Sequence, residues 1–456
     1  MRQAMTQPSV VRTTALPADT PEVAVAIVGA GACGLTAAVM LRDAGIDCVL
    51  LERDARAQGS TALSSGFIPA AGTAVQGAAG VHDDSPARFA ADIQAKARGC
   101  AAPQLAAAYT QAIGPAMDAL QQRHGLGFEL LDGFLYPGHS LRRMHALPQR
   151  TGAALVAALE AAATQAGAML LTDALVRELY CDAQGRVLGL GYLRPDGSTE
   201  TLACRALLLA CNGFGGNAQM VAAQLPEMRG AIFAGHAGND GSAIAWGRAL
   251  GAGLADLGGW QGHGAWAVPQ GALITWALMM QGGVQVNALG QRFHDETQGY
   301  SEAAVQVLAQ PGGMAWAVFD DPLLALGRSF PDFVGAEAAG ALRHAADAPA
   351  LAALIGCQAD VLAQTLAGSR LSPPFHAIKV TGALFHTQGG LAIDAQCRVL
   401  REDGRPLPNL LAAGGAARGV SGNAVWGYLS GNGLLSAVAG GAIAAATMQT
   451  LLEETP

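Results

Sequence analysis

A single tyrosine stands inside a glycine-rich stretch near the C-terminus, "GNAVWGYLSGNG", residues 422–433. Glycines at this density leave backbone N–H groups open to a ligand, because no side chain covers them. The stretch is therefore expected to contact a bound molecule. The role of the Tyr428 phenol depends on what that molecule is.

A second glycine-rich motif lies near the N-terminus, in "EVAVAIVGAGACGLTAAVMLRDAGIDCVLLERD". The pattern predicts a strand, a glycine turn, an amphipathic helix and a second strand, which together form one βαβ unit. Gly29 allows the tight turn, Gly31 lets the backbone approach a pyrophosphate, and Gly34 lets helix and strand pack closely. Glu52 ends the second strand, where its carboxylate can accept hydrogen bonds from ribose hydroxyls. The joint placement predicts a dinucleotide site with the diphosphate at the helix N-terminus.

Composition excludes several classes of protein. The 456 residues are 51% hydrophobic, enough for a large core and two domains. A net charge of −8 without a run of Lys or Arg argues against nucleic acid or an anionic membrane surface as a partner. The eight cysteines form no CxxC pair and no zinc-type spacing, so we predict no metal site and a reducing cytoplasm. The longest apolar runs fall short of a bilayer span, so no membrane insertion is expected.

The elements that must position these motifs follow along the chain. The loop "GSTALSSGFIPAAGT" suits contact with a cofactor, and "TLACRALLLACNGFGGN" is an apolar strand that returns the chain to it through a glycine turn. A closing helix is expected to begin near Asn432. The first 22 residues lack an apolar segment and are expected to form a disordered tail. The predicted organisation is a tail over 1–22, the dinucleotide-binding domain over 23–260 and 381–456, and a second domain over 261–380.

In their order, these motifs resemble the flavoproteins of the fumarate reductase and succinate dehydrogenase superfamily, with their 3-ketosteroid dehydrogenase relatives. The resemblance spans nearly the whole chain, and its anchors are "VGAGACG" with Glu52, "GSTALSSG", "LLLACNGFGGN", "GNDGSAIAWGRALGA", "VNALGQRFHDE", "HTQGGLAID" and "LLAAGG". It implies an α/β fold, in which a discontinuous Rossmann-like domain binds FAD and a smaller α+β capping domain closes over the isoalloxazine. Members with covalent FAD carry a histidine in the "GSTALSSG" loop. This chain has none, so FAD is expected to be noncovalent.

The resemblance also implies which residues contact FAD. The dipole of the closing helix would favour the negative charge that reduction places at the flavin N1/C2=O locus. The expected contacts are Gly29, Gly31, Ala32, Cys33, Gly34, Glu52, Arg53, Gly59, Ser60, Thr61, Ser64, Ser65, Gly66, Val176, Cys211, Asn212, Gly213, Asn217, Asp240, Gly414, Gly415, Asn432, Leu434 and Leu435.

Two departures from the fumarate reductase pattern bear on the substrate. Fumarate reductases carry one arginine after "RF..E" as proton donor and another in the loop before the closing helix as a carboxylate clamp. Here the two positions hold Tyr300 and Tyr428. A dicarboxylate would lose two charge-assisted contacts. Tyrosines at these places are instead similar to those of the 3-ketosteroid dehydrogenases.

That branch of the family implies a mechanism. Tyr428 and the N–H of Gly431 or Gly433 would polarise a ketone and stabilise its enolate. Tyr300 would take the α proton while the β hydrogen leaves as hydride to flavin N5. A free phenol has a pKa of about 10, so Tyr300 needs help to act as a base. Further candidates for the catalytic site are Ser430, Tyr136 and His386.

Three functional interpretations follow. The first is an FAD-dependent dehydrogenase that desaturates an uncharged cyclic ketone, either a 3-ketosteroid or a cyclohexanone-type ring, and passes electrons to an external acceptor, since the chain has no haem motif. The second is an ene-reductase of an unsaturated carboxylic acid, which would need a remaining arginine such as Arg292 or Arg418. The third is a non-catalytic electron-transfer flavoprotein, which would lack a substrate-sized cavity beside the flavin.

Overall fold

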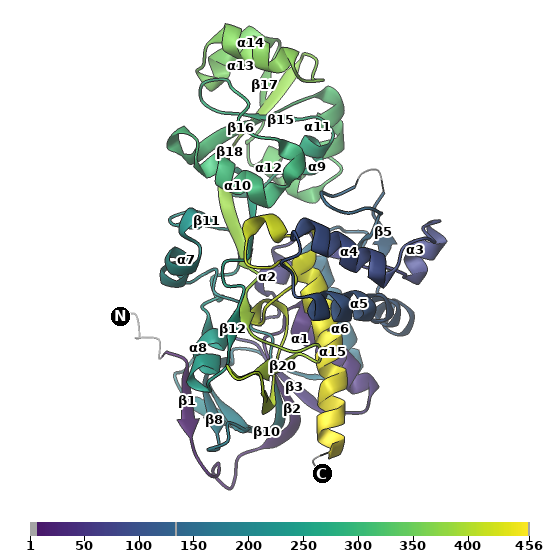
Figure 1. Ribbon diagram of the computed structural model, residues 1–456, viewed down its shortest axis with the longest axis vertical. Helices are drawn as coiled ribbons and strands as arrows, with labels where there is room; N and C mark the ends of the chain where they lie inside the picture. The colour runs from purple at the N-terminus through teal and green to yellow at the C-terminus, as the bar shows by residue number, and fades with distance from the viewer. Residues whose placement is uncertain (1–6, 133–134, 455–456) are drawn as a thin grey trace.

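The computed structural model describes residues 7–132 and 135–454, which form two lobes stacked along the long axis (Figure 1). The larger lobe is built on a mixed sheet with the strand order β1-β8-β9-β10-β2-β3-β7, to which β21 is added beside β10 and β20 beside β21. Its strands are β1 (Ser9–Arg12), β2 (Glu22–Val28), β3 (Cys48–Leu51), β7 (Met169–Leu171), β8 (Leu175–Cys181), β9 (Val187–Leu193), β10 (Thr199–Leu209), β20 (Arg398–Leu400) and β21 (Pro406–Ala412).

The predicted βαβ unit is confirmed at the centre of this sheet. β2 continues into α1 (Ala32–Asp43), and β3 then pairs parallel to β2, with Val25 opposite Cys48. On the other side β10 runs parallel to both β2 and β21. The carboxyl ends of these strands therefore meet at one edge of the sheet, which is where doubly wound folds bind ligands.

Helices cover this sheet and close its ligand edge. The helix predicted near Asn432 is α15 (Asn432–Glu454), which packs against α1 and α5 (Pro103–His124). Within the described residues it is the one helix whose length and apolarity would suit a membrane span, but its apolar side is buried in this core. The other helices of the lobe are α2 (Gly59–Ala62), α3 (Ala74–Ala78), α4 (Pro86–Lys96), α6 (Gly152–Gln165), α7 (Ala218–Gln224) and α8 (Ser242–Ala249).

The expectation of a disordered tail over residues 1–22 is wrong for its described part. Residues Ser9–Arg12 form β1, which pairs in parallel with β8 from Glu178 to Cys181. Four residues are too few to predict a strand by periodicity, and the pairing partner lies far along the chain. Residues 1–6 lie outside the described residues.

The smaller lobe holds a second sheet with the order β14-β13-β18-β16-β15, and β11 and β17 also pair with β18. Its strands are β11 (Ile232–Phe233), β13 (Trp260–Ala267), β14 (Ala272–Leu273), β15 (Val284–Val286), β16 (Met314–Asp320), β17 (Arg343–Ala345) and β18 (Phe375–Thr387). Its helices are α9 (Ala277–Met280), α10 (Tyr300–Leu308), α11 (Asp321–Gly327), α12 (Pro331–Ala338), α13 (Ala348–Ile355) and α14 (Ala359–Ala367). The long strand β18 runs from this capping lobe down to the larger lobe (Figure 1).

Candidate functional site: a nucleotide cavity between the lobes

One cavity extends from the carboxyl edge of the parallel strands to the capping lobe, and its empty space, part of it open to solvent, is about 2010 Å³. All seven candidates for the catalytic site line it, namely Tyr136, Tyr300, His386, Tyr428, Ser430, Gly431 and Gly433. The predicted cofactor residues that line it are Gly29, Gly31, Ala32, Cys33, Glu52, Arg53, Gly59, Ser60, Thr61, Ser64, Ser65, Gly66, Val176, Cys211, Asn212, Asp240, Gly414, Gly415 and Leu434.

Five predicted cofactor residues lie outside the lining. A Cβ on Gly34 would meet Gly29 O at 2.0 Å, and one on Gly213 would meet Thr387 Oγ1 at 2.1 Å, so both serve backbone packing. Asn217 caps α7 and donates to the carbonyl of Asp240. Asn432 donates to Ser421 Oγ, and Leu435 is fully buried in the core. These five residues contact protein in the structure, and direct contact with FAD stays a prediction for them.

The glycine turn lines the cavity at the N-terminus of α1 and packs closely against the end of β10. Gly29 has φ of +104°, and a Cβ there would lie 2.7 Å from Ala210 O. Thr61 Oγ1 accepts a hydrogen bond from Ala32 N at 3.1 Å, so α2 is fixed against the same turn. The free N–H groups and dipole of α1 favour an anion at this position.

Glu52 is placed at the end of β3 with only 5% of its surface exposed. Its Oε2 accepts from Ala30 N at 3.0 Å and its Oε1 from Asp54 N at 3.1 Å. Burial raises the pKa of this carboxyl, although the two backbone hydrogen bonds oppose the shift. Each oxygen keeps a lone pair for a ribose hydroxyl.

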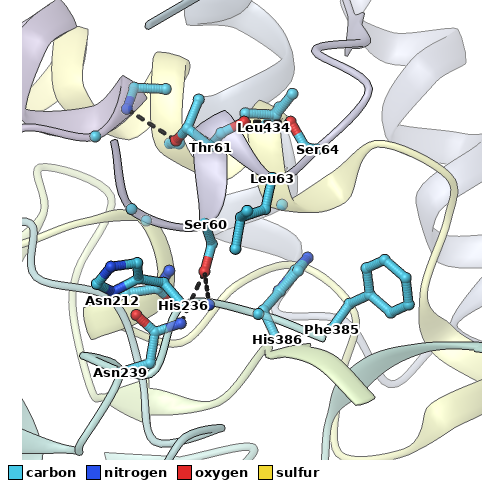
Figure 2. Close-up of a pocket in the computed structure, with 18 of the residues that line it drawn as sticks. Ser60, Thr61, Leu63, Ser64, Asn212, His236, Asn239, Phe385, His386 and Leu434 are labelled. Carbon is cyan, nitrogen blue, oxygen red and sulfur yellow. Dashed lines mark hydrogen bonds between the residues drawn. The ribbon is translucent and has the colours of Figure 1, made fainter. Parts of the chain in front are cut away.

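The loop matched by "GSTALSSG" forms a polar wall of the cavity (Figure 2). Ser60 Oγ accepts hydrogen bonds from His236 N at 3.3 Å and from Asn239 Nδ2 at 2.8 Å. Ser64 Oγ donates to Thr61 O at 2.7 Å. The loop is thereby fixed in place before a ligand binds.

A buried hydroxyl in the first turns of α15 points to a ligand at this end. Ser436 is 3% exposed and lines the cavity, yet its Oγ has no hydrogen-bond partner among the described residues. Buried hydroxyls are normally satisfied, so a cofactor atom is its expected partner. Together with the cradle around Gly29 and the acid Glu52, this hydroxyl fits FAD.

The far end of the cavity brings the two predicted tyrosines together. Tyr300 begins α10 in the capping lobe, Tyr428 lies in the loop before α15, and their ring centroids are 6.1 Å apart at 60°. Burial raises the pKa of Tyr428 to about 12 and that of Tyr300 well above its usual value. A hydrogen bond with Ser430 lowers the pKa of Tyr300 and so opposes part of its shift. Both phenols are protonated at neutral pH.

Backbone donors and a neutral imidazole surround Tyr428. Gly433 N donates to the Tyr428 hydroxyl at 3.5 Å, and a Cβ on Gly433 would lie 2.6 Å from His386 Nε2. The His386 ring is 5.7 Å from the Tyr428 ring. Burial lowers the pKa of His386 to about 4, so the imidazole adds no charge.

Sequence reasoning missed several residues of the site, and two of them, His263 and Asp332, come from the capping lobe. His263 stacks on Tyr300 with centroids 4.9 Å apart at 17°. Its Nδ1 accepts from Ala265 N, and burial lowers its pKa to about 3, so it is a neutral ring. Asp332, at the start of α12, also lines the cavity. Neither residue stands in a recognisable motif.

Cationic side chains are scarce around this cavity. Among the described lining residues the only guanidinium is that of Arg53, which donates to Gly238 O at 2.8 Å and faces Asp240 at 3.6 Å. The two arginines named for an acid substrate are paired elsewhere. Arg292 forms a forked ion pair with Glu296, and Arg418 contacts Asp256 at 2.7 Å.

This fold and site define a flavin-dependent oxidoreductase. The family model of the FAD binding domain matches residues 24–434, so the chain belongs to that family, and the predicted FAD is confirmed. The chain is 27% identical to an NADH:fumarate oxidoreductase of Klebsiella pneumoniae (strain 342) over 87% of its length, but it spans only 45% of that protein. It is 25% identical to a 4-oxocyclohexanecarboxylate 2-dehydrogenase of Sinomonas cyclohexanicum, covering 86% of this chain and 87% of the relative. The structure of a 3-ketosteroid-Δ4-(5α)-dehydrogenase from Rhodococcus jostii RHA1 superposes with a TM-score of 0.75 at 25% identity, covering 97% and 99% of the two chains.

Proposed function

We propose that this FAD-dependent oxidoreductase desaturates an uncharged cyclic ketone next to its carbonyl group. One observation carries the proposal. Tyr300 and Tyr428 face each other at the end of the FAD cavity, and Arg53, the only guanidinium among its described lining residues, is held by Asp240. A dicarboxylate bound there would have no cationic partner for its negative charges. Burying such unpaired charges costs far more than burying a neutral ketone.

We assign to Tyr428 the role of hydrogen-bond donor to the carbonyl oxygen of the substrate. The raised pKa of Tyr428 keeps the hydroxyl protonated, so the phenol is a donor. The N–H of Gly433 makes a long contact of 3.5 Å to the same hydroxyl, and a ketone oxygen bound there would take this N–H as its second donor. Two donors fixed before substrate binds stabilise the charge that develops as the α carbon loses its proton.

We assign to Tyr300 the role of the base that accepts the α proton of the substrate. Burial raises the pKa of Tyr300, so it accepts that proton only as its own proton moves to the adjacent Ser430 hydroxyl, which in turn must pass a proton on to solvent. The neutral His263 ring holds the phenol by stacking. Bound FAD supplies the acceptor for the hydride that leaves the β carbon, so one proton and one hydride are removed and one C=C bond forms.

The raised pKa of Tyr300 also favours a second candidate, the reduction of a conjugated cyclic enone. In that direction a protonated Tyr300 delivers the α proton while Tyr428 holds the same oxygen. The residues keep their places and only the electron flow reverses. An ene-reductase of an unsaturated acid finds less support, since neither Arg292 nor Arg418 lines the cavity.

Relatives named for carbonyl substrates match nearly the whole chain, and fumarate reductases match it over a similar length. The 4-oxocyclohexanecarboxylate and 3-ketosteroid dehydrogenases align with this chain over at least 86% of both partners. The NADH:fumarate oxidoreductase carries more than half of its length outside the match.

Anaerobic mixing of the FAD-loaded protein with a panel of substrates tests the proposal. Cyclohexanone or a 3-ketosteroid should bleach the flavin absorbance, and succinate should not. Reoxidation by a dye would then accompany the appearance of the unsaturated ketone. Bleaching by succinate, with no response to any ketone, would overturn the proposal.

A further inference from the structure

A carboxylate stands among the aromatic side chains of the substrate end of the cavity. Asp332, in the first turn of α12, lines the cavity together with Tyr136, Trp276 and Phe330. Its Oδ2 accepts a hydrogen bond from Ser65 Oγ at 2.8 Å. Within the described residues Asp332 has no cationic partner and its Oδ1 accepts no hydrogen bond.

The structural contacts of Asp332 use only part of the hydrogen-bonding capacity of its carboxylate. The position at the start of α12 favours a negative charge, and the bond to Ser65 joins the two lobes. A carboxylate offers about four acceptor sites, however, and Ser65 uses one. Asp332 is half-buried, and burial beside aromatic rings raises the pKa of its carboxyl. A hydrogen-bond donor on a ligand would offset the cost of this burial.

Asp332 and the tyrosines line the same cavity. Phe330, two residues before Asp332, belongs to the same buried apolar cluster as Tyr300 and Tyr428, and Tyr136 packs against that cluster. Tyr300 lies beside Tyr428. Asp332 thus lines the part of the cavity in which a ring held at Tyr428 would lie.

We propose that Asp332 forms a substrate subsite that accepts a hydrogen bond from a hydroxyl group on the ring, remote from the ketone. The inference rests on the proposed function and narrows its substrate to hydroxylated cyclic ketones. A carboxylate at the same ring position is disfavoured, because it would face the Asp332 carboxylate without a cation.

The experiment compares cyclohexanone, 4-hydroxycyclohexanone and 4-oxocyclohexanecarboxylate as substrates of the FAD-loaded wild-type protein, Asp332→Leu, Asp332→Asn and Ser65→Ala. In the wild type we expect kcat/KM for the hydroxy ketone to exceed that for cyclohexanone about tenfold, the scale of one hydrogen bond to a charged group. Asp332→Leu should abolish that ratio. Asp332→Asn should raise the relative activity on the carboxylate, because the repelling charge is gone.

Ser65→Ala is the matched control. This variant removes the contact between the lobes and keeps the Asp332 carboxylate. The ratio of kcat/KM for the hydroxy ketone to kcat/KM for cyclohexanone should therefore be preserved, even if both values change. A ratio near one in the wild type, or a ratio unchanged in Asp332→Leu, overturns the subsite and leaves Asp332 as a contact between lobes.

A binding measurement separates this inference from the proposed function. Cyclohexane-1,4-diol and cyclohexanol, which carry no ketone, are titrated into the oxidised FAD-loaded protein and followed by the flavin spectrum. Tighter binding of the diol in the wild type, lost in Asp332→Leu, supports the subsite even if no ketone is turned over, in which case the proposed reaction alone fails. Equal binding of both alcohols overturns the subsite.

Discussion

Nε2 of His139 lies 2.9 Å from the carbonyl oxygen of Ser430 and holds the loop that carries Tyr428. On the other side of the ring, Nδ1 lies 3.5 Å from Nη1 of Arg143, which can only donate, so Nε2 carries the proton. Arg143 has a fully buried side chain and forms ion pairs with Asp84 and Asp92. This buried ionic cluster therefore fixes the tautomer and position of the histidine behind the candidate catalytic loop.

The first prediction tests the hydrogen bond from His139 to the carbonyl oxygen of Ser430. His139→Leu removes the donor to Ser430, so the loop should lose its fixed position and ketone turnover should fall roughly tenfold. FAD binding should persist, since His139 does not line the cavity. His139→Gln can still donate through its amide and should recover part of the rate. Equal losses in both variants would show that the ring contributes packing and not this hydrogen bond.

The second prediction concerns the carbonyl donor. Tyr428→Phe removes one hydroxyl and keeps the ring, so turnover should fall by roughly 10²-fold or more, the scale for losing one oxyanion donor. The flavin spectrum and thermal unfolding temperature should stay near those of the wild type. Wild-type turnover in this variant would remove Tyr428 from the reaction.

The third prediction uses the narrow space around Gly433. A Cβ at this position would lie 2.6 Å from His386 Nε2, so Gly433→Ala should displace the imidazole or the loop and lower turnover by tenfold or more. Gly335→Ala is the control, because Gly335 lies within a helix and a Cβ there meets nothing within 4 Å. The control should be neutral or slightly stabilising. Full activity of Gly433→Ala would mean that His386 has room to move.

The fourth prediction is a pH dependence of stability. Burial lowers the pKa of His139 from 6.5 to about 4, so between these values the unfolded chain binds a proton that the folded chain does not. The free energy of unfolding should therefore fall as the pH drops from 7 to 5, by about 2 kcal/mol for this one group. Urea unfolding at saturating FAD measures the effect. His139→Gln should show a smaller decrease, and an identical pH profile in the variant would contradict the assignment.

The sequence was sufficient for the nucleotide end of the site and insufficient for the substrate end. Gly29, Gly31 and Glu52 belong to one short βαβ unit, whose geometry follows from local spacing. His263 and Asp332 reach the cavity only because the capping lobe folds over it, and single polar residues in apolar segments carry no periodic signal. The strand β1 was missed for a similar reason, since its pairing with β8 is a tertiary contact.

Tyr300 and Tyr428 were only partly predictable from the sequence. Their positions were predicted from the family pattern, but 127 residues separate them in the chain, and only the folded structure gives the 6.1 Å between their rings. Their raised pKa values follow from burial, which no local pattern encodes. The sequence thus predicted two side chains that line the cavity, and the structure adds the burial that keeps them protonated.

The central claim is that an uncharged carbonyl compound binds with its oxygen at Tyr428 and its neighbouring carbon at Tyr300. A crystal structure of the FAD-loaded protein with phenol, a planar mimic of the enolate, tests it most directly. We expect the phenol oxygen within hydrogen-bond distance of both Tyr428 Oη and the N–H of Gly433, with Tyr300 Oη over the adjacent ring carbon. A phenol bound away from both hydroxyls, in a protein that instead holds succinate through an arginine, would contradict the account.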